Sequence, residues 1–210
     1  MNLVTIIVTR SKSCHVKTLH TILRMNLKCV QRNFKNEIIF VDDDPYAKAN
    51  VVQKYIKTCD RIFFVDFGIG VDEKSIDQIF EPHESIGCMV FPGVKEGIDW
   101  ELFKNKIRQS STEPIDQMGL HFDTEVGNKI SESIYSVINT NAKVWFINTK
   151  NVLKSIKDRK TGNYTIHPKL LEKFKEKGVK MCAFTASKLT ITYAHECISN
   201  ILNAAGVKAS

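Results

Sequence analysis

The feature that most constrains the fold is a buried strand that ends abruptly on an acidic residue. Residues 62–65 read Ile-Phe-Phe-Val, a continuous apolar run of β-branched and aromatic side chains. Such a run predicts a central strand covered on both faces. Asp66 and Gly68 follow it, and a helical pattern begins after Asp72. Ligands of open α/β sheets bind beyond the carboxyl ends of strands, so Asp66 is well sited to hold a divalent cation. The alternative is that Asp66 caps a turn and Asp72 caps the helix.

The rest of the chain alternates between strand and helix patterns. Strands are expected at residues 3–8, 37–41, 86–91, 144–147, 181–184 and 189–193. One helix is expected at residues 15–33, with apolar residues at Val16, Leu19, Leu23, Leu27 and Val30. Further helices are expected to begin at Pro45 and at Thr149 and to span residues 168–178. Two more are indicated by apolar stripes, one at Val126, Ile130, Ile134 and Ile138 and one at Ile198, Ile201 and Leu202. This alternation predicts the α/β fold class with a largely parallel sheet. Residues 93–125 are less regular and are expected to form loops that shape a pocket.

The charge is distributed unevenly along the chain. Residues 1–36 carry seven Lys or Arg and no acid, whereas residues 37–150 carry twelve basic and nineteen acidic residues. Residues 151–180 carry nine basic and three acidic residues. If the fold brings the basic segments near Asp66, they surround a cation site with positive charge, which suits a metal-bound diphosphate. Nucleic-acid binding and simple solvation of helix faces are the competing interpretations.

Composition excludes several classes of protein. The length of 210 residues fits one domain, and no apolar run approaches the length of a membrane span. The six cysteines lie far apart without a Cys-x-x-Cys pair, which indicates reduced thiols in a cytoplasmic protein rather than a zinc site. The first ten residues lack the features of a signal peptide and predict a strand.

Three polar turns are expected at one edge of the sheet. They follow the first three strands and comprise Thr9–Lys12, Asp42–Asp44 and Asp66–Gly68. Right-handed crossovers bring the carboxyl ends of these strands together. Asp44 is a natural N-cap before Pro45, while Asp42 or Asp43 is placed to bind a base or ribose, or else to lie in a solvated turn.

Several familiar motifs are absent. Asp66-Phe67-Gly68 occurs without the other kinase motifs, and there is no dinucleotide fingerprint, Walker A motif or nucleophile elbow. Asp123 and Glu125 are candidates for an active-site acid or base, or for a capping box of a helix from Val126. His195 follows the last expected strand and is a candidate metal ligand.

A family resemblance rests on three segments. Residues 64–69, 72–76 and 86–92 resemble the Asp-x-Asp region of nucleotide-sugar glycosyltransferases of the GT-A fold. In that family an apolar strand ends in Asp-x-Asp, a short helix follows, and the next strand ends in an aromatic-Pro step. Residues 1–66 resemble the family's nucleotide-binding half, and residues 144–154 resemble its acceptor-side strand–helix unit. The whole chain is most similar to N-terminal glycosyltransferase domains of large multidomain chlorella virus proteins.

The resemblance implies a fold and an activity. The fold is a single-domain, GT-A-like three-layer α/β/α sandwich with a central, mostly parallel, twisted sheet. The nucleotide-binding half spans about residues 1–92 and the acceptor-side half about 93–210. The activity is transfer of a hexose or deoxyhexose from a UDP-sugar to a hydroxyl of a glycan or glycoprotein, assisted by Mn²⁺ or Mg²⁺, in viral glycan synthesis in the host cytoplasm. The partners are further domains of a larger polypeptide, with no nucleic acid and no membrane span.

The resemblance also assigns residues. The donor would contact Thr9, Arg10, Lys12, Asp42, Asp43, Val65, Asp66 and Gly68, with help from basic residues of 154–160. The metal would rest on Asp66, on the diphosphate and on His195. The chain departs from the family at Gly68, where the second acid of the motif is expected, and this departure predicts weaker metal dependence. The base would be Asp123, Glu125 or Asp158.

Two alternatives belong to other classes. A sugar-phosphate nucleotidyltransferase would use a similar α/β layout, although the Gly-rich first loop of such enzymes is missing. A non-catalytic nucleotide- or polyanion-binding module would have an affinity for polyanions that falls steeply with salt concentration and does not depend on divalent ions.

Overall fold

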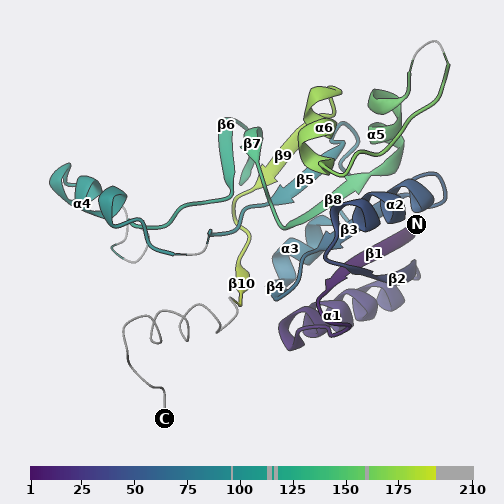
Figure 1. The fold of residues 1–210 in the computed structure, drawn as a ribbon, viewed down its shortest axis with the longest axis horizontal. Coiled ribbons are helices and arrows are strands. Elements are labelled where there is room, and N and C mark those ends of the chain that lie inside the picture. Colours follow the sequence, from purple (N-terminus) through teal and green to yellow (C-terminus); the bar gives the residue numbers. More distant parts are fainter. Residues whose placement is uncertain (96, 113–114, 116–117, 159–160, 193–210) are drawn as a thin grey trace.

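The computed structural model describes residues 1–95, 97–112, 115, 118–158 and 161–192 and contains an eight-stranded mixed sheet (Figure 1). Its strands lie in the order β2-β1-β3-β8-β5-β9-β7-β6. They are β1 Asn2–Thr9, β2 Lys35–Asp42, β3 Arg61–Val65, β5 Cys88–Phe91, β6 Thr124–Ser131, β7 Ile134–Thr140, β8 Val144–Asn148 and β9 Met181–Phe184. A separate two-stranded sheet pairs β4 Ile69–Val71 with β10 Leu189–Ile191. The predicted α/β fold class is confirmed.

Helices cover both faces of the large sheet. They are α1 Val16–Gln31, α2 Pro45–Tyr55, α3 Glu73–Gln78, α4 Trp100–Arg108, α5 Thr149–Ile156 and α6 Leu170–Glu176. Apolar residues of α1 and α3 join one core cluster, and those of α2, α5 and α6 join the other. The sheet separates the two clusters, which gives the expected three layers. None of the helices in the described part of the chain is long and apolar enough to cross a membrane.

The sheet contains both parallel and antiparallel pairs. β1 pairs in parallel with both β2 and β3, and β5 pairs in parallel with β9. β8 lies antiparallel between β3 and β5, and β7 is antiparallel to both β9 and β6. Six strands therefore run in one direction and only β7 and β8 oppose them. The carboxyl ends of β1, β2, β3 and β5 meet at one edge, as predicted from the crossovers for the first three.

The residues of β3 explain its central place. All five are buried, and its partner strands β1 and β8 cover both of its backbone edges. Phe64 stacks on Trp145 of β8 with ring centroids 4.7 Å apart, on one face of the sheet. Phe63 packs into the core cluster on the other face. The continuous apolar run is required because neither face of this strand meets water.

Residues 126–138 correct one prediction. They form the β6–β7 hairpin rather than a helix, with Ser133 in the left-handed region (φ 60°) at the turn. A spacing of four places residues on one face of a strand as well as on one face of a helix. The β-branched and aromatic content of β7 is compatible with a strand, and its pairing with β9 decides in favour of the strand. The capping box proposed for a helix from Val126 is therefore wrong, and Asp123 and Glu125 precede and enter a strand.

Helix α1 exists as predicted, but its apolar stripe faces outward. Its buried residues are Thr18, Thr21, Ile22, Met25 and Cys29. Two threonines lie inside because β4 needs acceptors: the backbone N–H of Ile69 donates to Thr18 Oγ1 and that of Val71 donates to Thr21 Oγ1. Satisfying buried backbone donors fixes the rotation of the helix.

Other differences are smaller. β5 begins at Cys88 rather than at Ile86, and β10 pairs with the unanticipated β4 instead of joining the main sheet. Within residues 93–125, helix α4 has no buried residue and extends away from the body on an arm (Figure 1). The last expected helix, along Ile198 to Leu202, lies outside the described residues.

Candidate functional site

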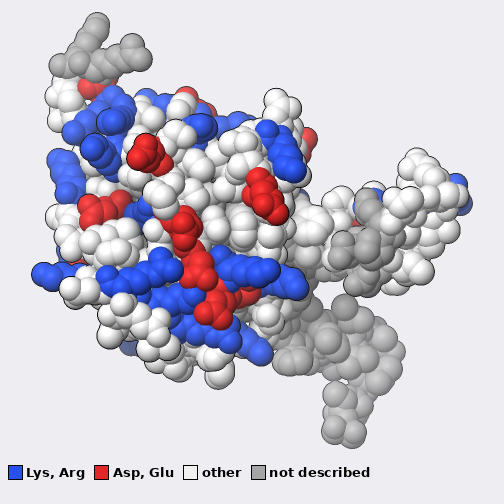
Figure 2. All heavy atoms as spheres, turned by 180° about the vertical axis from the view of Figure 1, so that it is seen from behind, with Lys and Arg blue, Asp and Glu red and all other residues white. Residues whose placement is uncertain are grey.

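A chain of alternating charges joins the carboxyl ends of β2 and β3. Arg10 Nε donates to Asp43 Oδ2 at 2.8 Å, and Lys48 Nζ donates to Asp43 Oδ1 at 2.5 Å. The same Lys48 nitrogen lies 3.9 Å from Asp66 Oδ1. Lys48 therefore bridges two carboxylates that sequence reasoning placed on separate turns. On the face that Figure 2 shows, acidic side chains lie between groups of Lys and Arg.

The environment of Asp43 favours its ionised form. Burial alone would raise the pKa of this carboxyl, but the hydrogen bonds and charges of Lys48 and Arg10 outweigh burial, so the pKa lies below its usual value. Asp43 is therefore a persistent negative charge that holds two cations in place at neutral pH.

Helix α2 positions Lys48. Asp44 caps the helix by accepting from the backbone N–H of Ala47 at 2.7 Å, and Pro45 occupies the first helical position. Both features confirm the prediction for this turn. Lys48 then lies in the first turn, where a positive charge opposes the helix dipole. A lysine in that position, four residues after the last of three consecutive aspartates, was a signal in the sequence that the prediction did not use.

Asp66 is fixed by its neighbours on both sides. Its backbone N–H donates to the backbone oxygen of Lys143, just before β8, at 2.9 Å, and its Oδ1 accepts from the backbone N–H of Phe67 at 2.8 Å. The Phe67 ring lies under the Arg10 guanidinium, 5.2 Å from its Cζ, and meets the His15 ring edge-on. Val65 is fully buried, so its contribution to a ligand site is limited to positioning Asp66.

Gly68 occupies a position that is strained for any residue with a side chain. Its φ is +77°, in the left-handed region, and a Cβ atom there would lie 2.9 Å from the backbone oxygen of Thr192. The Thr192 N–H donates to Gly68 O at 2.9 Å, which holds β10 against β4. A second carboxylate of an Asp-x-Asp motif at this position would therefore strain the backbone and require β4 or the segment after β10 to shift.

A cavity of about 450 Å³ adjoins the start of α1. It is lined by Thr9, Lys12, Cys14, Phe40 and Asp42. Three of these residues were predicted to contact a nucleotide, and the structure brings them together. Thr9 donates to Val41 O, and Lys12 lies in a tight left-handed turn (φ 59°). Phe40 was missed because its strand pattern suggested burial, yet its side chain is 57% exposed.

Asp123 lies at the same edge, next to the end of β5. Its Oδ1 accepts from the backbone N–H of Gly93 at 3.1 Å and from Thr124 Oγ1 at 2.8 Å. Burial raises its pKa, and these hydrogen bonds with the charges of Lys143 and Lys95 offset only part of the effect. Glu125 is different: it is exposed on β6 and pairs with Asn139 across the hairpin.

The largest cavity described lies on the other side of Gly93. Its volume is about 580 Å³, and its walls include Lys95, Phe122, Lys188 and the apolar strand β10. A Cβ atom on Gly93 would lie 3.0 Å from both Asp123 Oδ2 and Ile191 Cδ1, so this glycine lets three segments meet. A volume in this range suits a ligand the size of a sugar.

The remaining predicted residues lie elsewhere. α5 begins at the opposite edge of the sheet, where Thr149 N donates to Asp60 O, and the chain after it extends away from β4 (Figure 1). Lys154 to Lys157 and Asp158 are thus separated from Asp66. Arg159, Lys160 and His195 lie outside the described residues.

The described residues around Asp66 offer few side chains that could bind a metal ion. No group of three or more His, Cys, Asp or Glu side chains able to hold a metal occurs among the residues that the structure describes. Mg²⁺ and Mn²⁺ bound to nucleotides commonly use one or two carboxylates together with phosphate oxygens. Asp66 fits that minimal requirement, with most of the coordination left to the substrate and water.

Comparisons with known proteins give distant similarities only. No family model matches the chain, and no curated protein matches it in sequence. Similar solved structures include an inositol-1-phosphate CTP transferase from T. maritima, with 10% identity over 98% of both chains and a TM-score of 0.45. A Drosophila beta-1,4-galactosyltransferase 7 in complex with manganese and UDP-Gal has 8% identity over 94% of this chain and 73% of that one, with a TM-score of 0.47.

A third structure is a glycosyltransferase involved in glycosylation of the major capsid of PBCV-1. It has 8% identity over 87% of this chain and 81% of that one, with a TM-score of 0.41. Such values do not by themselves assign a family or an activity. The similar solved structures therefore include both glycosyltransferases and nucleotidyltransferases.

Proposed function

We propose that the chain is a glycosyltransferase that moves a hexose or deoxyhexose from a UDP-sugar to a hydroxyl of a glycan or glycoprotein. The observation that carries this proposal is the bridge from Asp43 through Lys48 to Asp66, beside a cavity with a basic and an acidic wall. Residues 1–92 would bind the nucleotide and residues 93–210 the acceptor. In viral glycan synthesis such a chain would be one domain of a larger protein.

Cations at the bridge would stabilise the diphosphate leaving group. Arg10, Lys12 and Lys48 come from two adjacent turns, and Asp43 holds two of them in fixed positions. Fixed cations stabilise charge that develops in a transition state without having to reorganise. The acidic wall formed by Asp42 would accept hydrogen bonds from the ribose or the base.

A divalent ion on Asp66 would add to this stabilisation. Mn²⁺ or Mg²⁺ supplies Lewis-acid neutralisation of the phosphate oxygens when it is bound. The role of Asp66 is to present one ionised oxygen beside Lys48, in an orientation fixed by the Phe67 N–H. Because Gly68 cannot carry a second ligand, metal dependence is expected to be weak.

Asp123 would accept the proton of the acceptor hydroxyl if the enzyme inverts the anomeric centre. A carboxylate with a raised pKa is a stronger base once ionised, and burial keeps competing water away. The ends of β3 and β5 are separated only by β8, hence by about 10 Å, which is compatible with a sugar between donor and base. Glu125 is the weaker candidate because it is exposed to solvent.

Calorimetric titration with nucleoside diphosphates, with and without Mn²⁺, tests the proposal. UDP is expected to bind, Mn²⁺ to strengthen binding modestly, and Asp66→Ala to abolish the metal effect while the circular dichroism spectrum is unchanged. Preference for a nucleoside triphosphate together with a sugar phosphate would favour a nucleotidyltransferase instead. Absence of binding to every nucleotide under both conditions contradicts the proposal.

A further inference from the structure

Helix α1 carries an exposed aliphatic stripe along its whole length. Val16, Leu19, Leu23, Leu27 and Val30 are between 45% and 76% exposed. At roughly 100° per residue they fall within an arc of about 80°, so they form one line on the outside of the helix. Scattered exposed apolar residues need no explanation, but a continuous row of five usually marks a contact surface.

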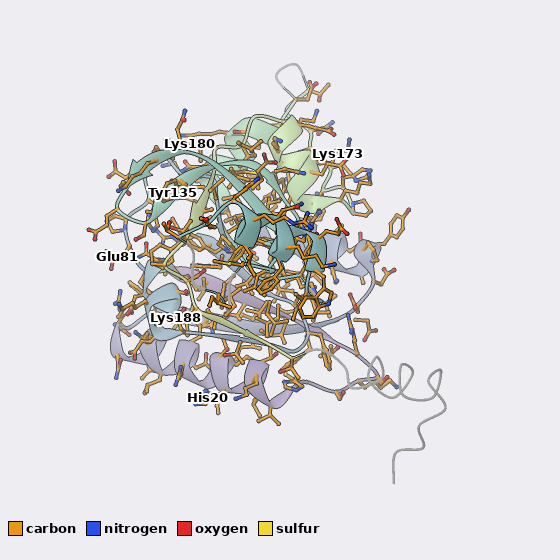
Figure 3. The ribbon with its side chains drawn as sticks, turned by 90° about the vertical axis from the view of Figure 1, so that its left-hand side faces the viewer. His20, Glu81, Tyr135, Lys173, Lys180 and Lys188 are labelled. Carbon is orange, nitrogen blue, oxygen red and sulfur yellow. The ribbon has the colours of Figure 1, made fainter. Side chains whose placement is uncertain are left out.

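The stripe is a convex ridge at the boundary of the molecule. Figure 3 shows α1 along the base of the structure, with His20 directed away from the sheet. At about 1.5 Å per residue, the row from Val16 to Val30 is about 21 Å long. A flat surface can contact all five side chains at once, since they lie on one line.

All the Lys, Arg, Asp and Glu side chains of α1 are basic. α1 contains Lys17, Arg24 and Lys28 and no acidic residue. Lys28 is paired with Glu73 and Asp77 of α3, whereas Lys17 and Arg24 form no ion pair within the described part of the chain. The unpaired cations beside an aliphatic row are complementary to an anionic, partly apolar surface.

We propose that the outer face of α1 binds the surface of an anionic lipid bilayer. An interfacial helix of this kind lies in the plane of the membrane, with its apolar row among the acyl chains and its basic residues at the headgroups. A second copy of the chain is disfavoured as the occupant because pairing two such faces would bring Lys17 and Arg24 of both copies together. This proposal does not depend on the proposed sugar transfer.

Vesicle flotation of the intact chain tests the proposal. The protein is expected to float with phosphatidylcholine vesicles that contain phosphatidylglycerol, at least about tenfold more than with phosphatidylcholine alone, and to dissociate as salt is raised. The double variant Leu23→Ser, Leu27→Ser should reduce the partition coefficient about tenfold or more. Arg24→Glu should have a similar effect on anionic vesicles.

Matched controls lie on other elements. Ile138→Ser changes a 48% exposed apolar residue of β7, and Lys150→Glu reverses an exposed charge of α5; both should float as the native chain does. Circular dichroism of all variants confirms folding. Failure to float, equal flotation with neutral vesicles, or unchanged flotation of the leucine variant each overturns the proposal. The proposal is also overturned if the only effect of the leucine substitutions is to convert a dimer into a monomer in light scattering. It is likewise overturned if the native chain binds an acidic helical peptide but no vesicles.

Discussion

Asp43 and Asp123 lie at the same edge of the sheet, in opposite electrostatic surroundings. Asp43 is held by Arg10 and Lys48, which lower its pKa despite burial. Asp123 accepts hydrogen bonds from neutral donors, and burial outweighs these bonds and the nearby charges of Lys143 and Lys95, so its pKa is raised. Two carboxylates with divergent pKa values in one site commonly have different tasks. The difference suggests that the Asp43 region binds charge while Asp123 exchanges a proton.

Asp123→Asn should produce the largest effect. The amide oxygen can still accept from Gly93 N–H and Thr124 Oγ1, so the loop should stay in place, while loss of the base should lower turnover of a UDP-sugar about 100-fold or more. UDP affinity, measured by calorimetry, should change little. Glu125→Gln is the matched control and should retain most of the turnover.

The stability of the same variant provides a second readout. An acid whose pKa is raised in the folded state destabilises the protein once pH exceeds its unfolded value, so Asp123→Asn should not lower the melting temperature at neutral pH. Loss of turnover together with a large loss of stability would mean that Asp123 has only a structural role.

Gly68→Ala tests whether the backbone next to Asp66 requires a glycine. The left-handed backbone and the contact with Thr192 O should together cost about 1–3 kcal/mol of unfolding free energy, measured by urea denaturation. Gly178→Ala is the control, because Gly178 has a similar φ of +74° and no atom within 4 Å of the added Cβ. Equal losses in the two variants would show that the close approach of β10 does not matter.

Asp66→Ala should weaken UDP binding in Mn²⁺ about tenfold, or by about 1.4 kcal/mol. Without metal the loss of UDP affinity should be smaller, because the variant then differs only in that Lys48 has lost one of its two carboxylate neighbours. Glu132→Ala, an exposed acid in the β6–β7 turn, controls for net charge. A metal effect that survives in the Asp66 variant would place the ion elsewhere.

Asp43→Asn should have a small effect on stability. A lowered pKa means that the ionised carboxylate stabilises the fold above the unfolded value of 3.8, and that this contribution is lost as pH falls through the folded pKa. The variant should lose about 0.5–1 kcal/mol at neutral pH, and the difference from the native chain should vanish in acid. Urea denaturation across pH measures it. A difference that persists in acid would point to packing rather than charge.

Residues 1–92 were more predictable than the rest of the chain. The apolar run of β3, the Asp44–Pro45 helix start and the convergence of three turns follow from local rules, because hydrophobic period and capping chemistry act over a few residues. The contact between Lys48 and Asp66 was missed because the two residues are distant in sequence, so only the fold brings them together.

The other half shows where local rules fail. Residues 126–138 fit both periods, and the choice between helix and strand depends on pairing with β9. Burial of Asp123 depends on contacts with Gly93 and Asn141, which no local pattern encodes. In the first half, helix α1 is an exception: its apolar stripe faces outward because β4 needs the threonine hydroxyls, so the amphipathic pattern predicted the helix but not its orientation.

The electrostatic difference between the two carboxylates can be measured directly. Carbon-13 NMR of aspartate side-chain carboxyl groups, assigned with Asp43→Asn and Asp123→Asn and followed across pH, gives both pKa values in one sample. Asp123 is predicted to titrate above the ordinary value of 3.8, and Asp43 below it. If Asp43 titrates at the same pH as Asp123 or higher, the proposed division between charge binding and proton transfer is contradicted.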